Sequence, residues 1–177
     1  MKLSIMKKSI RILLANFLVS IGLTACEHSS TVKTVDSVDL KFYAGTWYEI
    51  ASYPQFFERG CSNVKASYTL KGDYVEVHNA SIKNGEIKEI IGKAFVVENS
   101  GNAKLKVQFF WPFKGDYWII GLADDYSWAI ISSPKLKTLW ILSRTPKMEE
   151  ELYKSIIESL VKRGFDESKI VKMEQKY

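Results

Sequence analysis

Two cysteines and two histidines are the side chains of this 177-residue chain best suited to act as nucleophiles or metal ligands. They are Cys26, Cys61, His28 and His78, and their spacing matches neither the CxxC nor the HExxH arrangement used by zinc sites. The sequence also contains no GxSxG nucleophile turn and no glycine-rich phosphate loop of the GxxxxGK(S/T) or GxGxxG type. We therefore expect no metal site, no cofactor and no catalytic residue.

The first 26 residues predict a covalent modification. A cationic stretch over residues 1–11 precedes an apolar stretch over residues 12–23. Twelve residues rise only about 18 Å as a helix, whereas a hydrocarbon core is about 30 Å thick, so a secretory signal fits better than a membrane-spanning helix. The stretch ends in Leu23-Thr24-Ala25-Cys26, which resembles the lipobox of bacterial lipoproteins. In such signals the cysteine thiol receives a diacylglyceryl group, cleavage occurs before the cysteine, and its amine is then acylated.

This resemblance implies a lipoprotein signal peptide over residues 1–25, a lipid anchor on Cys26 and a polar tether over residues 26–39. Several acyl chains, at about 0.8 kcal/mol per buried methylene, hold a protein firmly on a membrane. Glu27 stands after the cysteine in place of aspartate, which implies the outer membrane by resemblance to enteric lipoproteins, with the protein facing the periplasm. The alternative is a plain cleaved signal that happens to precede a cysteine.

The formal net charge of +5 is concentrated in the signal region. Residues 1–25 contain four basic side chains and no acidic one, which leaves 21 basic and 20 acidic side chains in the remainder. Neutralising nucleic-acid phosphates needs a clustered basic face. We therefore expect no nucleic-acid partner.

Short runs of β-branched and aromatic residues, separated by turn residues, begin at Gly45. They predict strands over residues 45–53, 64–70, 74–81, 87–97, 104–111, 116–123, 127–132 and 138–144. Asn84-Gly85 is the strongest hairpin signal, because both residues tolerate a positive φ. Eight strands at hairpin spacing predict an all-β fold, an antiparallel up-and-down sheet that avoids exposed edges by closing into a barrel.

The hydrophobic period changes after residue 144. Thr145 suits an N-cap, Pro146 a first helical position and Gly164 a C-cap. Between them, apolar side chains recur on one helical face: Met148, Leu152, Ile156, Ile157, Leu160 and Val161. We expect one C-terminal α-helix packed on the barrel wall and a short edge strand over residues 170–173, all within one domain over residues 40–177.

Several segments together resemble the lipocalin family. Gly45-Thr46-Trp47 resembles its GxW signature, Tyr117-Trp118-Ile119-Ile120 begins the sixth predicted strand, and the eighth ends in Leu142-Ser143-Arg144 before the helix. The resemblance covers essentially residues 40–177. The loop Ala123-Asp124-Asp125-Tyr126 departs from the T-D-Y of many animal members and matches the bacterial branch.

The family resemblance implies a barrel with one closed end. A tryptophan at the start of the first strand forms a flat plug, and we expect Arg144 to lie across the ring of Trp47 in a cation–π contact of about 1–2 kcal/mol. We therefore expect Gly45, Trp47 and Arg144 to be a structural motif rather than a ligand site.

Strand alternation and position matching to the lipocalin pattern assign the side chains that face the interior. The expected ligand-binding residues are Phe56 and Phe57, in a loop that covers the mouth, with Ala66, Tyr68, Val77, Asn79, Val107, Phe109, Tyr117, Ile119, Ala129, Ile131, Trp140 and Leu142. The small inward residues Ala51, Ala66, Ala94 and Ala129 favour residual space over a filled interior. An apolar lining without a basic cluster favours a fatty acid or lysophospholipid, with its polar head at the mouth near Tyr68, Asn79 or Tyr117.

The leading hypothesis is thus a membrane-tethered carrier that stores or moves lipids in the cell envelope and is not an enzyme. One alternative is a lipocalin-type enzyme in which Cys61 or Glu49 acts on a bound lipid. Against it, we expect Cys61 to be a small buried side chain and Glu49 to hydrogen-bond near the barrel floor. Another alternative is an interaction module that contacts other envelope proteins or forms a homodimer.

Overall fold

The computed structural model describes residues 32–56 and 58–176. The predicted signal peptide, the Cys26 lipidation site, His28 and Phe57 lie outside the described residues. Among the residues described, no helix is both long enough and apolar enough to cross a membrane.

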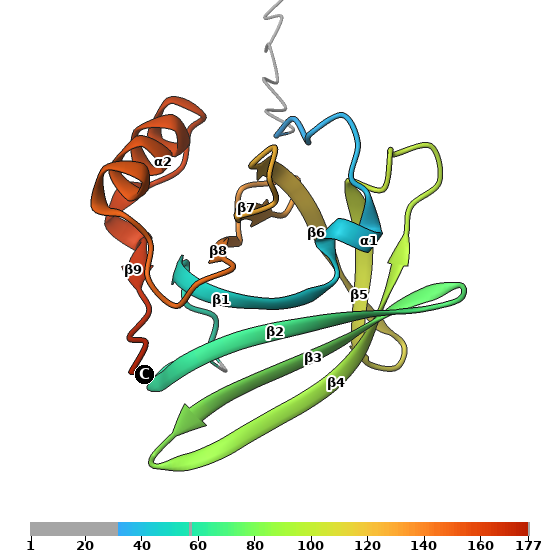
Figure 1. Cartoon of the computed structure of the whole chain (residues 1–177), viewed down its shortest axis with the longest axis horizontal. Coiled ribbons are helices and arrows are strands. Elements are labelled where there is room, and N and C mark those ends of the chain that lie inside the picture. The colour runs from blue at the N-terminus through green and yellow to red at the C-terminus, as the bar shows by residue number, and fades with distance from the viewer. Residues whose placement is uncertain (1–31, 57, 177) are drawn as a thin grey trace, which may run out of the picture.

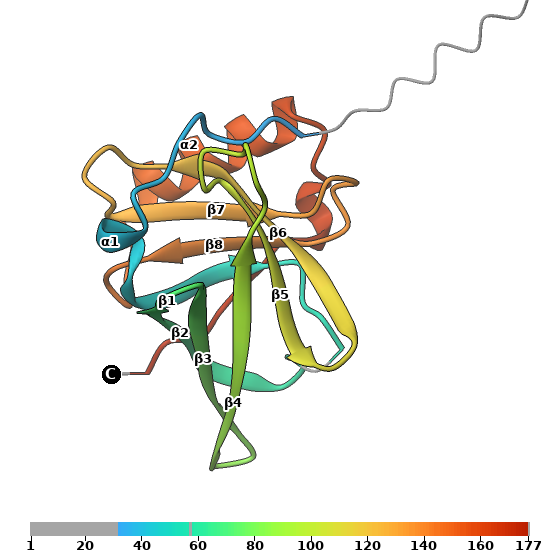
Figure 2. The ribbon, with the colours of Figure 1, turned by 90° about the vertical axis from the view of Figure 1, so that its right-hand side faces the viewer.

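Eight antiparallel strands follow one another around a barrel, each hydrogen-bonded to the next, and β1 closes the circle by pairing with both β2 and β8 (Figures 1 and 2). The strands are β1 (Gly45–Ser52), β2 (Cys61–Lys71), β3 (Tyr74–Lys83), β4 (Glu86–Val96), β5 (Lys104–Phe110), β6 (Phe113–Leu122), β7 (Trp128–Ser132) and β8 (Leu139–Ser143). The expected all-β barrel is confirmed, because turn residues fall between runs long enough to pair. Asn84 and Gly85 form the predicted β3–β4 turn with φ of 55° and 79°.

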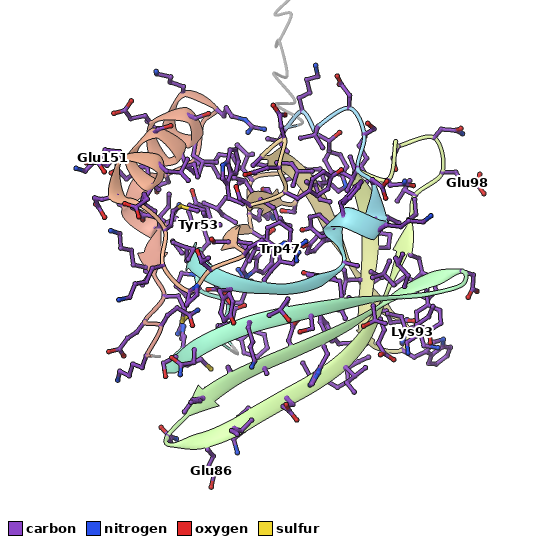
Figure 3. The ribbon with its side chains drawn as sticks, viewed as in Figure 1. Trp47, Tyr53, Glu86, Lys93, Glu98 and Glu151 are labelled. Carbon is purple, nitrogen blue, oxygen red and sulfur yellow. The ribbon has the colours of Figure 1, made fainter. Side chains whose placement is uncertain are left out.

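The strands bury two apolar faces. The interior cluster contains Trp47, Ile119 and Leu142, while Ile130 and Ile141 point outward into a second cluster with Leu160 of α2 (Glu150–Lys162). Helix α2 therefore covers the outside of the wall, as its apolar stripe predicts (Figure 1). Figure 3 shows Trp47 inside the barrel, with Glu86, Glu98 and Glu151 at the periphery.

Helix α2 begins five residues after the expected N-cap. The hydroxyl of Thr145 donates to the carbonyl oxygen of Lys147 at 2.6 Å, so it closes a local turn instead of capping a helix. Glu149 holds the N-cap position. The helix ends at Lys162 and its C-cap is Arg163, one residue before the predicted C-cap Gly164. Gly164 follows with a φ of 90°, and the amide of Phe165 donates to the carbonyl oxygen of Leu160 at 3.1 Å.

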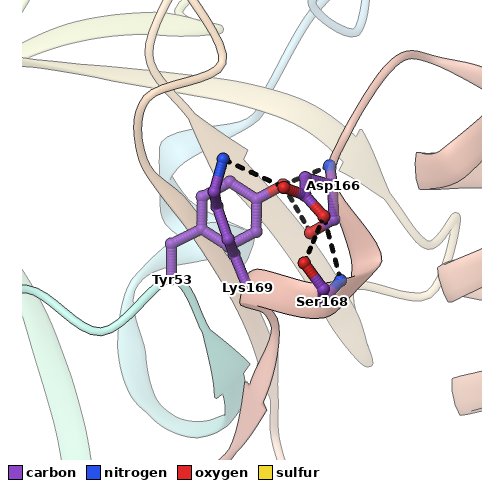
Figure 4. Close-up of polar contacts among 4 residues, drawn as sticks. All are labelled: Tyr53, Asp166, Ser168 and Lys169. Atoms are coloured by element: carbon purple, nitrogen blue, oxygen red, sulfur yellow. Dashed lines mark hydrogen bonds and ion pairs between the residues drawn. The ribbon is translucent and has the colours of Figure 1, made fainter.

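A hydrogen-bonded clasp joins the end of α2 to the end of β1 (Figure 4). The hydroxyl of Tyr53 donates to the carbonyl oxygen of Asp166 at 3.0 Å and accepts from the Asp166 amide at 2.6 Å. The Asp166 carboxylate accepts from Ser168 and pairs with Lys169 at 3.0 Å, which shapes the 3-10 helix η1 (Glu167–Lys169). The chain then adds β9 (Val171–Lys172) beside β1, which confirms the expected edge strand.

The residues before the barrel pack against it. Val38 is 2% exposed, and its amide donates to Gly101 at 2.8 Å, while the amide of Val35 donates to Ile119 at 3.0 Å. A short helix that the sequence analysis did not predict, α1 (Leu40–Tyr43), then leads into β1. Residues 32–39 of the expected tether are therefore held on the barrel.

A β-bulge changes one inward assignment. The register between β1 and β8 shifts between Glu49 and Ala51, so residues on either side of the shift no longer alternate regularly. Glu49 faces the interior cavity, but Ala51 belongs to the outer cluster under α2. The expectation that Ala51 faces inward was wrong for this reason.

Candidate ligand-binding cavity

The barrel encloses a cavity of about 480 Å³, within the range of ligand pockets in proteins. Its lining consists of Glu49, Glu58, Val64, Lys65, Ala66, Tyr68, Val77, Asn79, Val107, Phe109, Phe110, Phe113, Lys114, Gly115, Asp116, Tyr117, Trp140 and Leu142. The lining side chains of Phe110 and Phe113 are also exposed to solvent, so the cavity opens at the β5–β6 turn. By strand order, the β1–β2 loop lies at the same end of the barrel.

Trp47 and Arg144 close the opposite end. The Arg144 guanidinium carbon lies 3.9 Å from the centre of the Trp47 ring. Its nitrogens donate to the carbonyl oxygens of Thr46, Phe42, Tyr43 and Tyr126 at 2.6–3.3 Å, which ties α1 and the β6–β7 loop to the plug. Gly45 has a φ of 97°, and a Cβ there would lie 3.3 Å from the Arg144 guanidinium. Glycine at this position thus allows both the turn and the close approach.

Three tyrosine hydroxyls form a chain just above this plug. The Tyr117 hydroxyl lies 2.7 Å from that of Tyr43 and 2.8 Å from that of Tyr68. The Tyr43 ring lies 5.0 Å from the Trp47 ring, and burial raises the pKa of Tyr68 to about 12. These hydroxyls are therefore neutral and near the closed end. The expectation that Tyr68 and Tyr117 mark the mouth was wrong, because their hydroxyls bond to α1 through Tyr43.

Two carboxyl groups border the cavity between floor and mouth. Glu49 is 2% exposed, and burial, reinforced by the charge of Glu58, raises its pKa to about 8 although the Ser52 hydroxyl hydrogen-bonds to it. Glu58 accepts from the indole of Trp140 at 3.1 Å and from the Gln55 amide at 3.0 Å, and burial raises its pKa too. Glu49 thus lies in the cavity wall rather than at the floor.

Nine of the fourteen expected ligand-binding residues line this cavity: Ala66, Tyr68, Val77, Asn79, Val107, Phe109, Tyr117, Trp140 and Leu142. Ile119, Ala129 and Ile131 face inward but are fully buried in the interior cluster. Strand alternation assigns a face but no depth, and these three pack against other side chains rather than open space. Phe56, expected in the cover over the mouth, is 80% exposed and does not occur among the described lining residues.

Strand alternation did not identify the lining residues at strand ends. Phe110 and Phe113 flank the β5–β6 turn, and the β5–β6 register shifts between Val107 and Phe110, so consecutive residues Phe109 and Phe110 both reach the cavity. Glu58 comes from the β1–β2 loop, where alternation does not apply. The run of aromatic residues Phe109-Phe110-Trp111, with Phe113 two residues later, was the available signal for this rim.

The remaining reactive side chains lie elsewhere. Cys61, at the start of β2, is partly exposed rather than buried as expected, and its sulfur accepts from the Ser81 hydroxyl at 3.7 Å. Cys61 does not occur among the described residues that line the cavity. His78 lies 3.3 Å from Glu89 on the outer face of the sheet. Within residues 32–56 and 58–176, no three His, Cys, Asp or Glu side chains are grouped as metal ligands.

Comparison with known proteins places this geometry in a family. Residues 38–175 match the family model of the lipocalin-like domain. The outer membrane lipoprotein Blc of Vibrio cholerae is 41% identical over 149 residues, which covers 82% of this chain and 87% of that protein. Temperature-induced lipocalin-1 of Arabidopsis thaliana is 40% identical over 154 residues, covering 81% of this chain and 83% of its own length.

Solved structures share the fold at lower identity. Insecticyanin from the tobacco hornworm Manduca sexta matches with a TM-score of 0.67 at 24% identity, over 81% of this chain and 84% of that chain. The closed barrel, the Trp47–Arg144 plug and the C-terminal helix all lie within the matched residues. The chain belongs to the lipocalin family.

Proposed function

We propose that this lipocalin is a lipid-anchored protein of the bacterial outer membrane that binds fatty acids or lysophospholipids for storage or transport in the cell envelope. The observation that carries the proposal is the cavity of about 480 Å³, which has mostly apolar walls and opens at one end of the barrel. Its relatives include proteins named outer membrane lipoprotein Blc in several bacteria.

A single acyl chain fits the chemistry of this lining. Burying a dozen methylenes contributes roughly 10 kcal/mol before the costs of binding are counted. Glu49, whose pKa is raised to about 8, is mostly neutral at neutral pH and offers no positive charge to a negatively charged headgroup. The Glu58 carboxyl repels such a headgroup when it is ionised. Lys65 and Lys114 are the basic residues of the lining, and Lys114 is exposed at the rim.

The place where the described chain begins supports membrane attachment near the mouth. Figure 2 shows residues 32–39 running from the end where β5 joins β6 toward α1 at the opposite end. The six residues from Cys26 to 31 span at most about 20 Å, so a lipid on Cys26 holds the barrel close to the membrane. Exposed Phe56, Phe110, Trp111 and Phe113 surround the opening, as suits a surface that meets lipid.

A pair of tryptophan substitutions tests ligand binding. The protein to use is the chain from residue 26 with Cys26→Ser, which keeps every residue the structure describes. Ala66→Trp fills the cavity from β2 and should weaken binding of a fluorescent fatty acid at least tenfold. Thr69→Trp adds a larger side chain on the exposed part of the same strand and should leave binding unchanged.

Palmitate and a palmitoyl lysophospholipid should each displace the fluorescent probe. Equal binding by the Ala66→Trp variant, or no displacement by either lipid, would falsify the ligand assignment. The anchor is tested separately by mass spectrometry of the mature protein extracted from membranes. It should begin at Cys26 and carry acyl masses, which Cys26→Ser removes.

A further inference from the structure

The two strands that close the barrel, β1 and β2, separate in its open half. Their pairing extends as far as Tyr48, which lies opposite Lys65. Beyond this pair each strand shifts register against its other neighbour, β1 after Glu49 and β2 after Ser62. Because such irregularities bend a strand, β1 and β2 diverge, and the described register contains no β1–β2 pair further toward the open end. This divergence leaves a seam in the barrel wall.

The C-terminal segment, residues 173–176, fills the seam. Figure 1 shows it running from β9 to the start of β2. On the β1 side, the amide of Met173 donates to the carbonyl oxygen of Ile50 at 2.9 Å. On the β2 side, the Asn63 side chain accepts from the Lys176 amide at 2.6 Å and donates to the Lys176 carbonyl oxygen at 3.1 Å. The C-terminal segment therefore takes over the bonds that β1 and β2 no longer make with each other.

Gln175 joins the two strands next to the ligand cavity. Its side-chain nitrogen donates to the carbonyl oxygen of Glu49 at 2.8 Å and to that of Val64 at 2.9 Å. Glu49 and Val64 both line the cavity, whereas Gln175 does not occur among the described lining residues. A primary amide has two protons to donate, so this one side chain can link β1 to β2 where their own pairing has ended. The cavity wall thus depends on a residue near the end of the chain.

An open seam would be a second entrance to the cavity. Without Gln175, the carbonyl oxygens of Glu49 and Val64 need other hydrogen-bond partners, which water supplies once the strands part. An acyl chain lying against these residues could then exchange through the wall as well as through the mouth. Segments that cover a site control the rates of binding and release in this way.

We propose that Gln175 is a positioning residue of the ligand site, which seals the seam between β1 and β2 and so confines lipid exchange to the open end of the barrel. The inference rests on the proposed function, because it assumes that the cavity holds lipid. A seal differs in kinetics from a contact that only supports the fold. Opening a second entrance lowers the barrier in both directions, so binding and release accelerate together, whereas a loosened fold weakens binding without faster association.

Stopped-flow kinetics of a fluorescent fatty acid test the seal. The protein is the same chain from residue 26 with Cys26→Ser. Gln175→Met keeps the length of the side chain but cannot donate to either carbonyl oxygen. Its association and dissociation rate constants should both rise about 3–10-fold, with the Kd changing less than either. Deleting residues 173–177 should raise both rate constants further.

Tyr53→Phe is the matched control. It removes two hydrogen bonds to the backbone of Asp166, close to the C-terminal segment, and Tyr53 does not occur among the described lining residues. It should lower the free energy of unfolding, measured with urea, about as much as Gln175→Met does, and leave both rate constants at the parent values.

The comparison is decided by Gln175→Met, which is the smaller change. Parent rate constants in this variant, or faster release with unchanged association, overturn the seal while the ligand-binding proposal stands. Equal acceleration by Tyr53→Phe overturns it too, because the effect would then follow stability rather than the seam. Failure of the parent to bind the probe overturns both proposals.

Discussion

At the scale of single residues, the buried carboxyl of Glu49 couples the stability of the barrel to pH. Its folded-state pKa of about 8 lies above the value of 4.5 expected in the unfolded chain. Between these values the folded protein binds more protons than the unfolded one, so its free energy of unfolding falls as pH rises. The carboxyl is thus tolerated in its neutral form and is costly when ionised.

Glu49→Gln should remove this part of the pH dependence. Glutamine keeps the size and hydrogen-bonding groups but does not ionise, so the variant should be more stable than the parent by about 4–5 kcal/mol near pH 9 and similar at pH 4. Urea unfolding from pH 4 to pH 9 measures the difference. Glu98→Gln, at an exposed position, is the control. Parallel stability profiles for Glu49→Gln and the parent would contradict the assignment.

At the scale of elements, segments before and after the eight strands hydrogen-bond to the barrel wall. Arg163, just after α2, donates to the carbonyl oxygens of Ile120 and Lys33 at 3.0 Å, which joins the helix end, β6 and the N-terminal segment. The Tyr53–Asp166 clasp fixes the same end of α2 to β1. These contacts hold residues 32–39 in place, so the packed segment next to the predicted lipid anchor is fixed on the barrel.

Gly101→Ala should release this segment. A Cβ at Gly101, whose φ is 58°, would overlap the carbonyl oxygen of Asp36, so either the β4–β5 turn or the segment must move. Gly85→Ala is the matched control, because Gly85 also has a positive φ but has nothing within 4 Å of an added Cβ. Gly101→Ala should be less stable than Gly85→Ala by about 1–3 kcal/mol.

Hydrogen exchange should locate the change caused by Gly101→Ala. The amides of Val35 and Val38 bond to Ile119 and Gly101, and both should exchange faster in this variant than in Gly85→Ala. Unchanged protection of both amides would show that the segment is held by other contacts.

At the scale of the whole molecule, the tyrosine hydroxyls of the interior lie at the end of the barrel opposite to the one expected from the sequence. The closed end carries three bonded tyrosine hydroxyls, whereas the open end carries exposed aromatic side chains. The chain that leads to the predicted anchor begins near the open end (Figure 2). The lipid transfer that we propose would therefore cross an apolar rim.

Trp111→Ser should slow the transfer of lipid between membrane and cavity without changing ligand affinity. Trp111 is 86% exposed at the tip of the β5–β6 turn and lies outside the set of described lining residues. Transfer of a fluorescent fatty acid from vesicles to the chain from residue 26 with Cys26→Ser should slow about 3–10-fold, because the rim loses its largest apolar contact. Phe42→Ser, at the opposite end and 67% exposed, should transfer at the parent rate. Equal slowing by both variants would show that the aromatic rim has no specific role in transfer.

The plug residues follow from the resemblance to the lipocalin family, whereas the sequence by itself determined the number and order of the strands and the apolar face of α2. Each depends on local signals: turn residues such as Asn84-Gly85, the two-residue alternation of strands and the helical period. The tertiary structure decided the depth and contacts of each inward residue. Ile119, Ala129 and Ile131 share the inward face with Val107 and Leu142, yet only the latter two meet open space. Bulges in β1 and β5, the tyrosine chain to α1 and the Glu58–Trp140 bond all depend on partners distant in sequence, which no local pattern encodes.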